Sequence, residues 1–185
     1  MPGRAGSRRA WGWHRLTDEW AARVVAAARV RPGELVLDIG AGRGALTAPL
    51  LGAGARVIAV EAHPGRADYL RERFAGRDVV VVAADALATR LPRRPFRVVA
   101  SPPYVITAPL LRLLLAPGSA LTAADLVLQR AVVCRQVNGD NRAAERIGRD
   151  WDIAMGISVP RRAFAPPPQV DSAVLVARRR RRGRR

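Results

Sequence analysis

The sequence predicts a single α/β domain built around a mostly parallel β-sheet of seven strands. Two observations lead to this fold class. Seven short runs rich in valine, isoleucine, leucine and alanine recur along the chain, and helical segments separate the earlier runs. The early runs are apolar throughout rather than alternating with polar residues, which is typical of strands that helices cover on both faces. A chain of 185 residues is long enough to bury a core of this kind.

The first regular element that we expect is a helix beginning after Thr17. Thr17 is a favourable N-cap residue, and the acids Asp18 and Glu19 suit the positive end of a helix dipole. Apolar residues then follow at helical spacing, at Trp20, Val24, Val25 and Ala28. We therefore expect a basic N-terminal arm over residues 1–16, before a catalytic domain over residues 17–177.

The remaining elements are expected in a regular order. Strands are predicted at residues 34–40, 56–62, 79–85, 96–102, 124–130, 151–160 and 172–178, with helices near 45–51, 66–74 and 109–115. No helix is expected between the last two strands, so these should form an antiparallel pair at one end of the sheet. The polar stretch 138–150 suggests a mobile insertion, and the arginine-rich residues 178–185 suggest a disordered tail.

Composition limits the classes of partner. The net charge is +17 and every basic residue is arginine, which favours a nucleic acid partner, although it also fits a compositional habit of the source genome. No apolar run is long enough for a membrane span and no signal peptide is recognisable, so we expect a cytoplasmic protein. Cys134 is the one cysteine, and with only His14 and His63 beside it no metal site is expected.

A ligand site is predicted where the first three strands end. The stretch LVLDIGAGRGALT reads as a strand, a turn with Gly40, Gly42 and Gly44, and the start of a helix. Asp38, Glu61 and Asp85 fall near the ends of three successive strands, at the edge where open α/β sheets bind ligands.

The three acids indicate the chemistry of the ligand. They would repel a pyrophosphate and attract the sulfonium and amino groups of S-adenosylmethionine, so we expect this cofactor rather than NAD. Glu61 lies about 20 residues after the glycine turn, where a carboxylate can accept both ribose hydroxyls. The alternative is that such carboxylates only cap helices.

A second site is predicted at Ser101-Pro102-Pro103-Tyr104. The two prolines fix the backbone and remove amide donors, so this stretch forms a rigid loop that positions the tyrosine.

These motifs together resemble one enzyme family. DIGAGRG, VEAHP, AADAL, SPPY and FAPPPQVDSAVL stand in the order and spacing of the rRNA adenine-N6 methyltransferases. The resemblance extends from Arg8 to Ala177 and is nearest to the short actinobacterial Erm enzymes of macrolide resistance. It implies a Rossmann-like class I S-adenosylmethionine-dependent methyltransferase fold.

The resemblance also implies roles for individual residues. Gly40 and Gly42 would line the methionine part of the cofactor, Glu61 would bind the ribose, and Asp85 would contact the adenine edge. Tyr104 would stack on a flipped target adenine, and aromatic stacking is worth roughly 1 to 3 kcal/mol per base. The implied catalytic residues are Ser101, Pro102, Tyr104 and Phe164, with Phe164 covering the base from its other side. The implied cofactor-binding residues are His14, Leu16, Gly40, Ala41, Gly42, Glu61, Ala62, Asp85, Ala86 and Ser101.

Three departures from the family pattern stand out. Trp13-His14-Arg15 replaces the usual Gln-Asn-Phe, and the chain stops where the family usually has a C-terminal helical domain. Ser101 replaces the Asn whose side chain, together with the carbonyl of the next residue, here Pro102, accepts the two hydrogens of the target amine. A serine hydroxyl has a shorter reach, so we expect turnover to be impaired.

The resemblance implies a monomeric enzyme that methylates N6 of an adenine in 23S rRNA, either naked or in an assembly intermediate. It implies no metal, and protection of the ribosome from macrolide-type drugs as the consequence. Two alternatives stay open. The chain could be a catalytically impaired rRNA-binding relative, or a methyltransferase of another planar nitrogen such as a glutamine amide.

Overall fold

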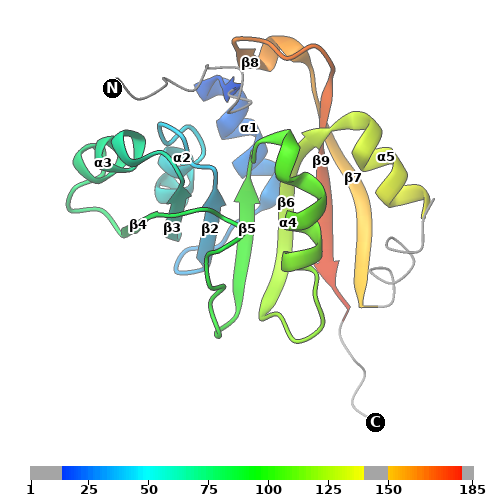
Figure 1. The fold of residues 1–185 in the computed structure, drawn as a ribbon, viewed down its shortest axis with the longest axis horizontal. Helices are drawn as coiled ribbons and strands as arrows, with labels where there is room; N and C mark the ends of the chain where they lie inside the picture. Colours follow the sequence, from blue (N-terminus) through cyan, green and yellow to red (C-terminus); the bar gives the residue numbers. More distant parts are fainter. Residues whose placement is uncertain (1–13, 140–149, 181–185) are drawn as a thin grey trace, which may run out of the picture.

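A seven-stranded sheet forms the centre of the computed structural model, which describes residues 14–139 and 150–180 (Figure 1). The strands lie in the order β4-β3-β2-β5-β6-β9-β7. Their bounds are β2 Leu35–Ile39, β3 Arg56–Glu61, β4 Val79–Ala83, β5 Phe96–Ala100, β6 Leu121–Gln129, β7 Trp151–Val159 and β9 Ser172–Arg179. All seven strands expected from the sequence are present, and the expected α/β fold is confirmed.

The sheet is parallel except at β9. β2 pairs in parallel with β3 and β5, β3 pairs with β4, and β5 pairs with β6. β9 runs antiparallel to both of its neighbours, β6 and β7. The expected antiparallel pair at one end of the sheet is therefore confirmed, with β7 as the outer strand.

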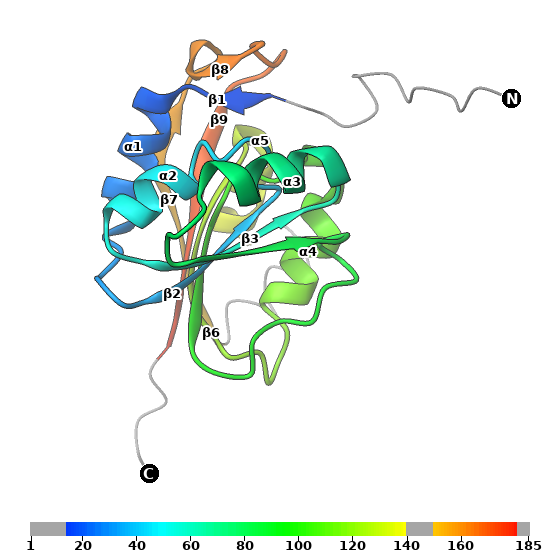
Figure 2. The same ribbon diagram turned by 90° about the vertical axis from the view of Figure 1, so that its left-hand side faces the viewer.

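Helices cover both faces of the sheet (Figure 2). Their bounds are α1 Asp18–Ala28, α2 Thr47–Gly52, α3 Pro64–Arg73, α4 Thr107–Leu114 and α5 Arg130–Asn138. Buried residues of α1, α2 and α3 share one apolar core with the sheet, whereas buried residues of α4 and α5 share the other. The helix expected after Thr17 is present, and Thr17 is its N-cap residue by backbone conformation, although its side chain makes no capping hydrogen bond.

Two parts of the fold were not expected from the sequence. Helix α5, which carries Cys134, ends at Gly139 in a left-handed conformation. A small antiparallel ribbon joins β1 Arg15–Leu16 to β8 Phe164–Ala165, and it lies beyond the carboxyl ends of the parallel strands (Figures 1 and 2). The ribbon places Arg15 and Leu16, the last two residues of the expected basic N-terminal arm, in a strand.

The predicted boundary of the C-terminal tail is also corrected. Strand β9 continues to Arg179, and its pairing with β6 includes Arg178, so these two arginines are ordered by ladder hydrogen bonds rather than disordered. Residues 181–185, and residues 140–149 of the expected mobile insertion, lie outside the described residues.

Candidate active site

A cavity of about 450 Å³ opens at the carboxyl ends of β2, β3, β4 and β5. All ten residues that the sequence suggested for cofactor binding line it: His14, Leu16, Gly40, Ala41, Gly42, Glu61, Ala62, Asp85, Ala86 and Ser101. Asp38 lines it as well. His14 and Leu16, near the N-terminus, reach this cavity because β1 pairs with β8.

The glycine loop lies close to the neighbouring loop after β5. Gly40 has a φ of 74°, and a Cβ added there would lie 3.1 Å from Cδ of Pro103. The N–H groups of Gly40 and Ala41 both donate to the carbonyl oxygen of Val60, at 2.8 and 3.1 Å. The loop is therefore fixed against β3, and its first position, Gly40, needs glycine for both conformation and space.

Glu61 ends β3 with a buried carboxylate. Its Oε2 accepts the N–H of Gly42 at 2.9 Å, and its Oε1 accepts the N–H of His63 at 2.8 Å. Arg66, on the first turn of α3, also contacts Oε1, from Nη2 at 2.9 Å and from Nε at 3.1 Å. The sequence reasoning missed Arg66, since its position on a helix did not show that the side chain turns back into the cavity.

Asp38 is the most deeply buried acid of the cavity, and only 1% of it is exposed. Burial raises the pKa of its carboxyl from 3.8 to about 7, an effect that the hydrogen bond from the Thr47 hydroxyl at 2.7 Å reduces and the charge of Glu61 increases. Asp38 can therefore change its charge near neutral pH.

Asp85 follows β4 by two residues and is more open. Its Oδ1 accepts the N–H of Leu87 at 2.9 Å, and the hydroxyl of Thr89 donates to its carbonyl oxygen at 2.8 Å. Asp85 thus caps a local turn rather than a helix, and it also lines the cavity.

The loop after β5 brings Ser101 to the cavity and holds Tyr104 beside it. Ser101 and Pro103 line the cavity, while Tyr104 begins the short 3₁₀ helix η1 Tyr104–Ile106. The hydroxyl oxygens of Tyr104 and Ser172 lie 2.7 Å apart in a hydrogen bond. Burial raises the pKa of the Tyr104 phenol above 10.0, against the effect of this bond. The expected loop is present, and Ser172 at the start of β9 holds its tyrosine.

His14 lies against the tyrosine. Its ring centroid is 6.2 Å from that of Tyr104, with 28° between the ring planes. Its Nδ1 donates to the carbonyl oxygen of Pro166 at 2.9 Å, which fixes the ring. His14 therefore links Tyr104 to the segment that follows β8.

Phe164 does not line the cavity, although it pairs with Leu16, which does. It is 4% exposed and packs in the core that α1 and α2 share with the sheet. Its implied role as the second cover of a target base stays a prediction, and in this structure the side chain supports the β1–β8 ribbon. Pro102 is also buried and does not line the cavity, and its role stays a prediction too.

Neither a membrane-spanning helix nor a metal-binding cluster is present among the described residues, 14–139 and 150–180. No helix in these ranges is long and apolar enough to cross a lipid bilayer. Within the same ranges, no group of three or more His, Cys, Asp or Glu side chains is arranged to hold a metal ion.

Several known proteins that this chain resembles are named as rRNA methyltransferases. A family model described as "Ribosomal RNA adenine dimethylase" matches residues 7–183. A protein named "Ribosomal RNA small subunit methyltransferase A" from Thermosynechococcus vestitus is 37% identical over 93% of this chain and 69% of its own length. A protein named "rRNA methyltransferase" from Streptomyces thermotolerans is 38% identical over 94% of this chain and 59% of its own.

Solved structures show the same fold. The crystal structure of the 23S rRNA methyltransferase ErmE superposes with a TM-score of 0.81 at 34% identity, over 89% of this chain and 69% of that one. A dimethyladenosine transferase from Plasmodium falciparum superposes with a TM-score of 0.78 at 24% identity, over 89% of this chain and 62% of that one. These relatives are all longer than the present chain. The fold is that of the class I methyltransferases.

Proposed function

Because the chain belongs to the ribosomal RNA adenine dimethylase family, we propose that it transfers methyl groups from S-adenosylmethionine to N6 of an adenine in rRNA. One observation carries the proposal: a single cavity joins the acidic strand ends to Ser101 of the loop that presents Tyr104. Cofactor and target amine would have to meet at that junction.

The residues of the cavity fit the cofactor. Glu61 and Asp85 are acceptors for a ribose diol and an adenine amine, and the fixed glycine loop allows close approach of the methionine part. Asp38 and its acidic neighbours favour a cationic ligand. When bound, S-adenosylmethionine supplies an electrophilic methyl group on a positively charged sulfur.

The chain's own contribution is positioning. An exocyclic adenine amine is a weak nucleophile because its lone pair is delocalised into the ring. The carbonyl oxygen of Pro102 and the hydroxyl of Ser101 would accept the two amine hydrogens, so that the lone pair turns towards the methyl group. Tyr104 would hold the flipped base by stacking, with its ring fixed by Ser172 and His14.

For the target we propose the large-subunit rRNA, with macrolide-type resistance as the consequence. The 34% identity and close superposition with the 23S rRNA methyltransferase ErmE support this choice. The cyanobacterial small-subunit methyltransferase, at 37% identity, supports the alternative target. Transfer of a tritiated methyl group to naked 23S and 16S rRNA, mapped by primer extension, decides between them. Labelling of neither RNA would contradict the proposed activity.

A second function, rRNA binding with little turnover, is favoured by Ser101 itself. Removing one preorganised hydrogen-bonding group of this kind typically costs about 3 to 4 kcal/mol in the barrier. We therefore expect Ser101→Asn to raise single-turnover methylation at saturating cofactor by about tenfold or more. Cofactor affinity should change far less. Equal rates for the two proteins would rule out the proposed role of this position.

A further inference from the structure

Arg66 contacts the carboxylate that the proposed function gives to the cofactor ribose. It lies on the first turn of α3, and its Nη2 and Nε are 2.9 and 3.1 Å from Oε1 of Glu61. The side chains are 18% and 5% exposed, so water screens this ion pair little. Arg66 itself lines the cavity.

The carboxylate of Glu61 is nearly saturated with donors. Oε1 accepts from the N–H of His63 and from two nitrogens of Arg66, and Oε2 accepts from the N–H of Gly42. A carboxylate offers about four lone-pair positions, about two on each oxygen. One position is therefore left, on Oε2, whereas a ribose diol has two hydroxyls to donate.

Only one of the present donors can leave without moving the backbone. The N–H of Gly42 belongs to the loop that Val60 fixes, and the N–H of His63 belongs to the N-cap residue of α3. The guanidinium of Arg66 ends a flexible side chain that is partly open to the cavity. If both ribose hydroxyls bind to Glu61, Arg66 gives way.

We propose that Arg66 occupies one ribose acceptor position on Glu61 and competes with the cofactor for it. The inference rests on the proposed function, because it takes Glu61 to be the ribose ligand. In the unliganded protein, Arg66 compensates the buried charge of Glu61. In the liganded protein, hydrogen bonds from the ribose hydroxyls replace those from Arg66 to the Glu61 carboxylate.

If Arg66 competes with the ribose, removing Arg66 should raise the affinity only for ligands that carry ribose hydroxyls. Arg66→Leu should bind S-adenosylhomocysteine about tenfold more tightly than the unchanged protein, the scale of one hydrogen bond to a charged group. The 2′,3′-dideoxy analogue of the same ligand should bind both proteins alike, because it has no hydroxyl to compete with Arg66. Isothermal titration calorimetry measures all four affinities without any turnover.

Two further variants isolate the effect. Arg43→Leu removes another positive charge from the cavity lining, and it should change the affinity for the two ligands by the same factor. Arg66→Gln removes the charge but keeps a polar side chain, and it should show the same preference for the hydroxylated ligand in a smaller degree. It also serves if Arg66→Leu folds poorly.

The outcomes separate the inference from the function on which it rests. Both Arg66 variants could instead bind S-adenosylhomocysteine more weakly while their affinity for the dideoxy analogue stays unchanged. That result would show that Arg66 helps to bind the ribose hydroxyls, and it would overturn the proposed competition. An equal change for both ligands would overturn it as well. If the unchanged protein and all variants bind neither ligand, the proposed cofactor fails and the inference fails with it.

Discussion

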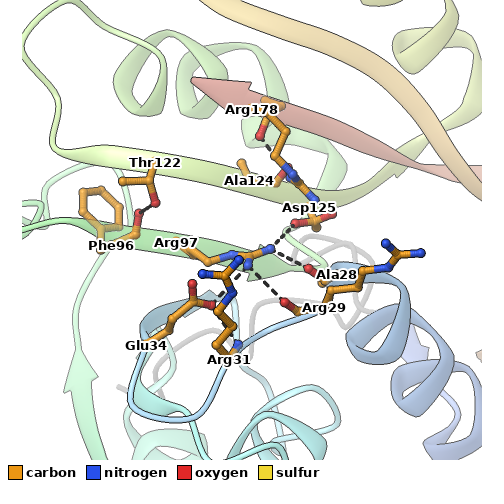
Figure 3. A network of polar contacts seen from close by, with 11 residues as sticks. Ala28, Arg29, Arg31, Glu34, Phe96, Arg97, Thr122, Ala124, Asp125 and Arg178 are labelled. Atoms are coloured by element: carbon orange, nitrogen blue, oxygen red, sulfur yellow. Dashed lines mark hydrogen bonds and ion pairs between the residues drawn. The ribbon is translucent and has the colours of Figure 1, made fainter. Parts of the chain in front are cut away.

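Two groups of acidic residues on the same sheet differ in how their charges are compensated. Glu34, just before β2, and Asp125, in the middle of β6, are paired with arginines (Figure 3). At the carboxyl ends of β2, β3 and β4, Asp38, Glu61 and Asp85 share a cavity, and among the described residues the one ion pair to these three is from Arg66. Arginines therefore compensate both acids of the first group, whereas in the second group Asp38 and Asp85 have hydrogen bonds without an ion pair, and all three acids line a cavity.

Glu34 and Asp125 form the arginine-paired group, which is organised around Arg97. The side chain of Arg97 is 11% exposed. Its guanidinium contacts Oε2 of Glu34 at 3.1 Å and Oδ2 of Asp125 at 3.3 Å, and it donates to the carbonyl oxygen of Ala28 at 2.6 Å. Arg178 contacts the other oxygen of Asp125 at 2.8 Å. One arginine thus links the end of α1, the start of β2 and the middle of β6, as Figure 3 shows.

The largest effect is expected from removing the arginine at the centre of this group. Arg97→Met leaves Asp125 buried with fewer donors and frees the carbonyl of Ala28, so the free energy of unfolding should fall by about 3 to 5 kcal/mol. Urea denaturation measures this change. Arg56→Met, which removes an exposed pair with Asp78, should cost at most about 1 kcal/mol. Equal losses in both variants would remove the distinction between the two groups.

The next effect concerns Asp38 and pH. Because the pKa of its carboxyl is raised from 3.8 to about 7 in the folded state, the folded protein holds a proton that the unfolded chain releases between these values. Its contribution therefore lowers stability as pH rises from about 4 to about 7, by about 3 to 4 kcal/mol in total.

Asp38→Asn isolates this contribution, because the amide does not titrate. The unfolding free energy of the variant, relative to that of the unchanged protein, should increase as pH rises from 4 to 7 and then level off. Denaturation curves at several pH values give this difference. A difference that does not change with pH would show that the pKa of Asp38 is not raised in the folded protein.

The smallest expected effect is on cofactor affinity. Glu61→Ala should weaken binding of S-adenosylhomocysteine by about 1 to 3 kcal/mol, the cost of leaving buried polar groups unpaired. Glu34→Ala is the matched change in the arginine-paired group, and it should lower stability while leaving this affinity unchanged. Calorimetry on both variants tests the comparison directly, and similar affinity losses would contradict it.

The sequence by itself determined the parallel sheet, the glycine loop and the position of three acids near strand ends. These features depend on local patterns: apolar runs of strand length, glycines that allow positive φ, and the rule that parallel strands end at one edge. Gly40, Gly42 and the three acids of these patterns line the cavity. His14 and Leu16, which only the family resemblance suggested, reach it through the β1–β8 ribbon. The short ribbon of Leu16 and Phe164 was beyond such patterns, because a strand of two residues has no period.

Only the tertiary structure decided which side chains meet across long separations in the chain. The sequence did not distinguish Arg97 from the many other arginines of the chain. The fold of β5 places it beside Glu34 and Asp125. Arg66 could have pointed into solvent, until the turn of α3 directed it to Glu61. Local propensity sets backbone conformation, but a buried charge is compensated by whichever partner the completed fold brings within hydrogen-bonding distance.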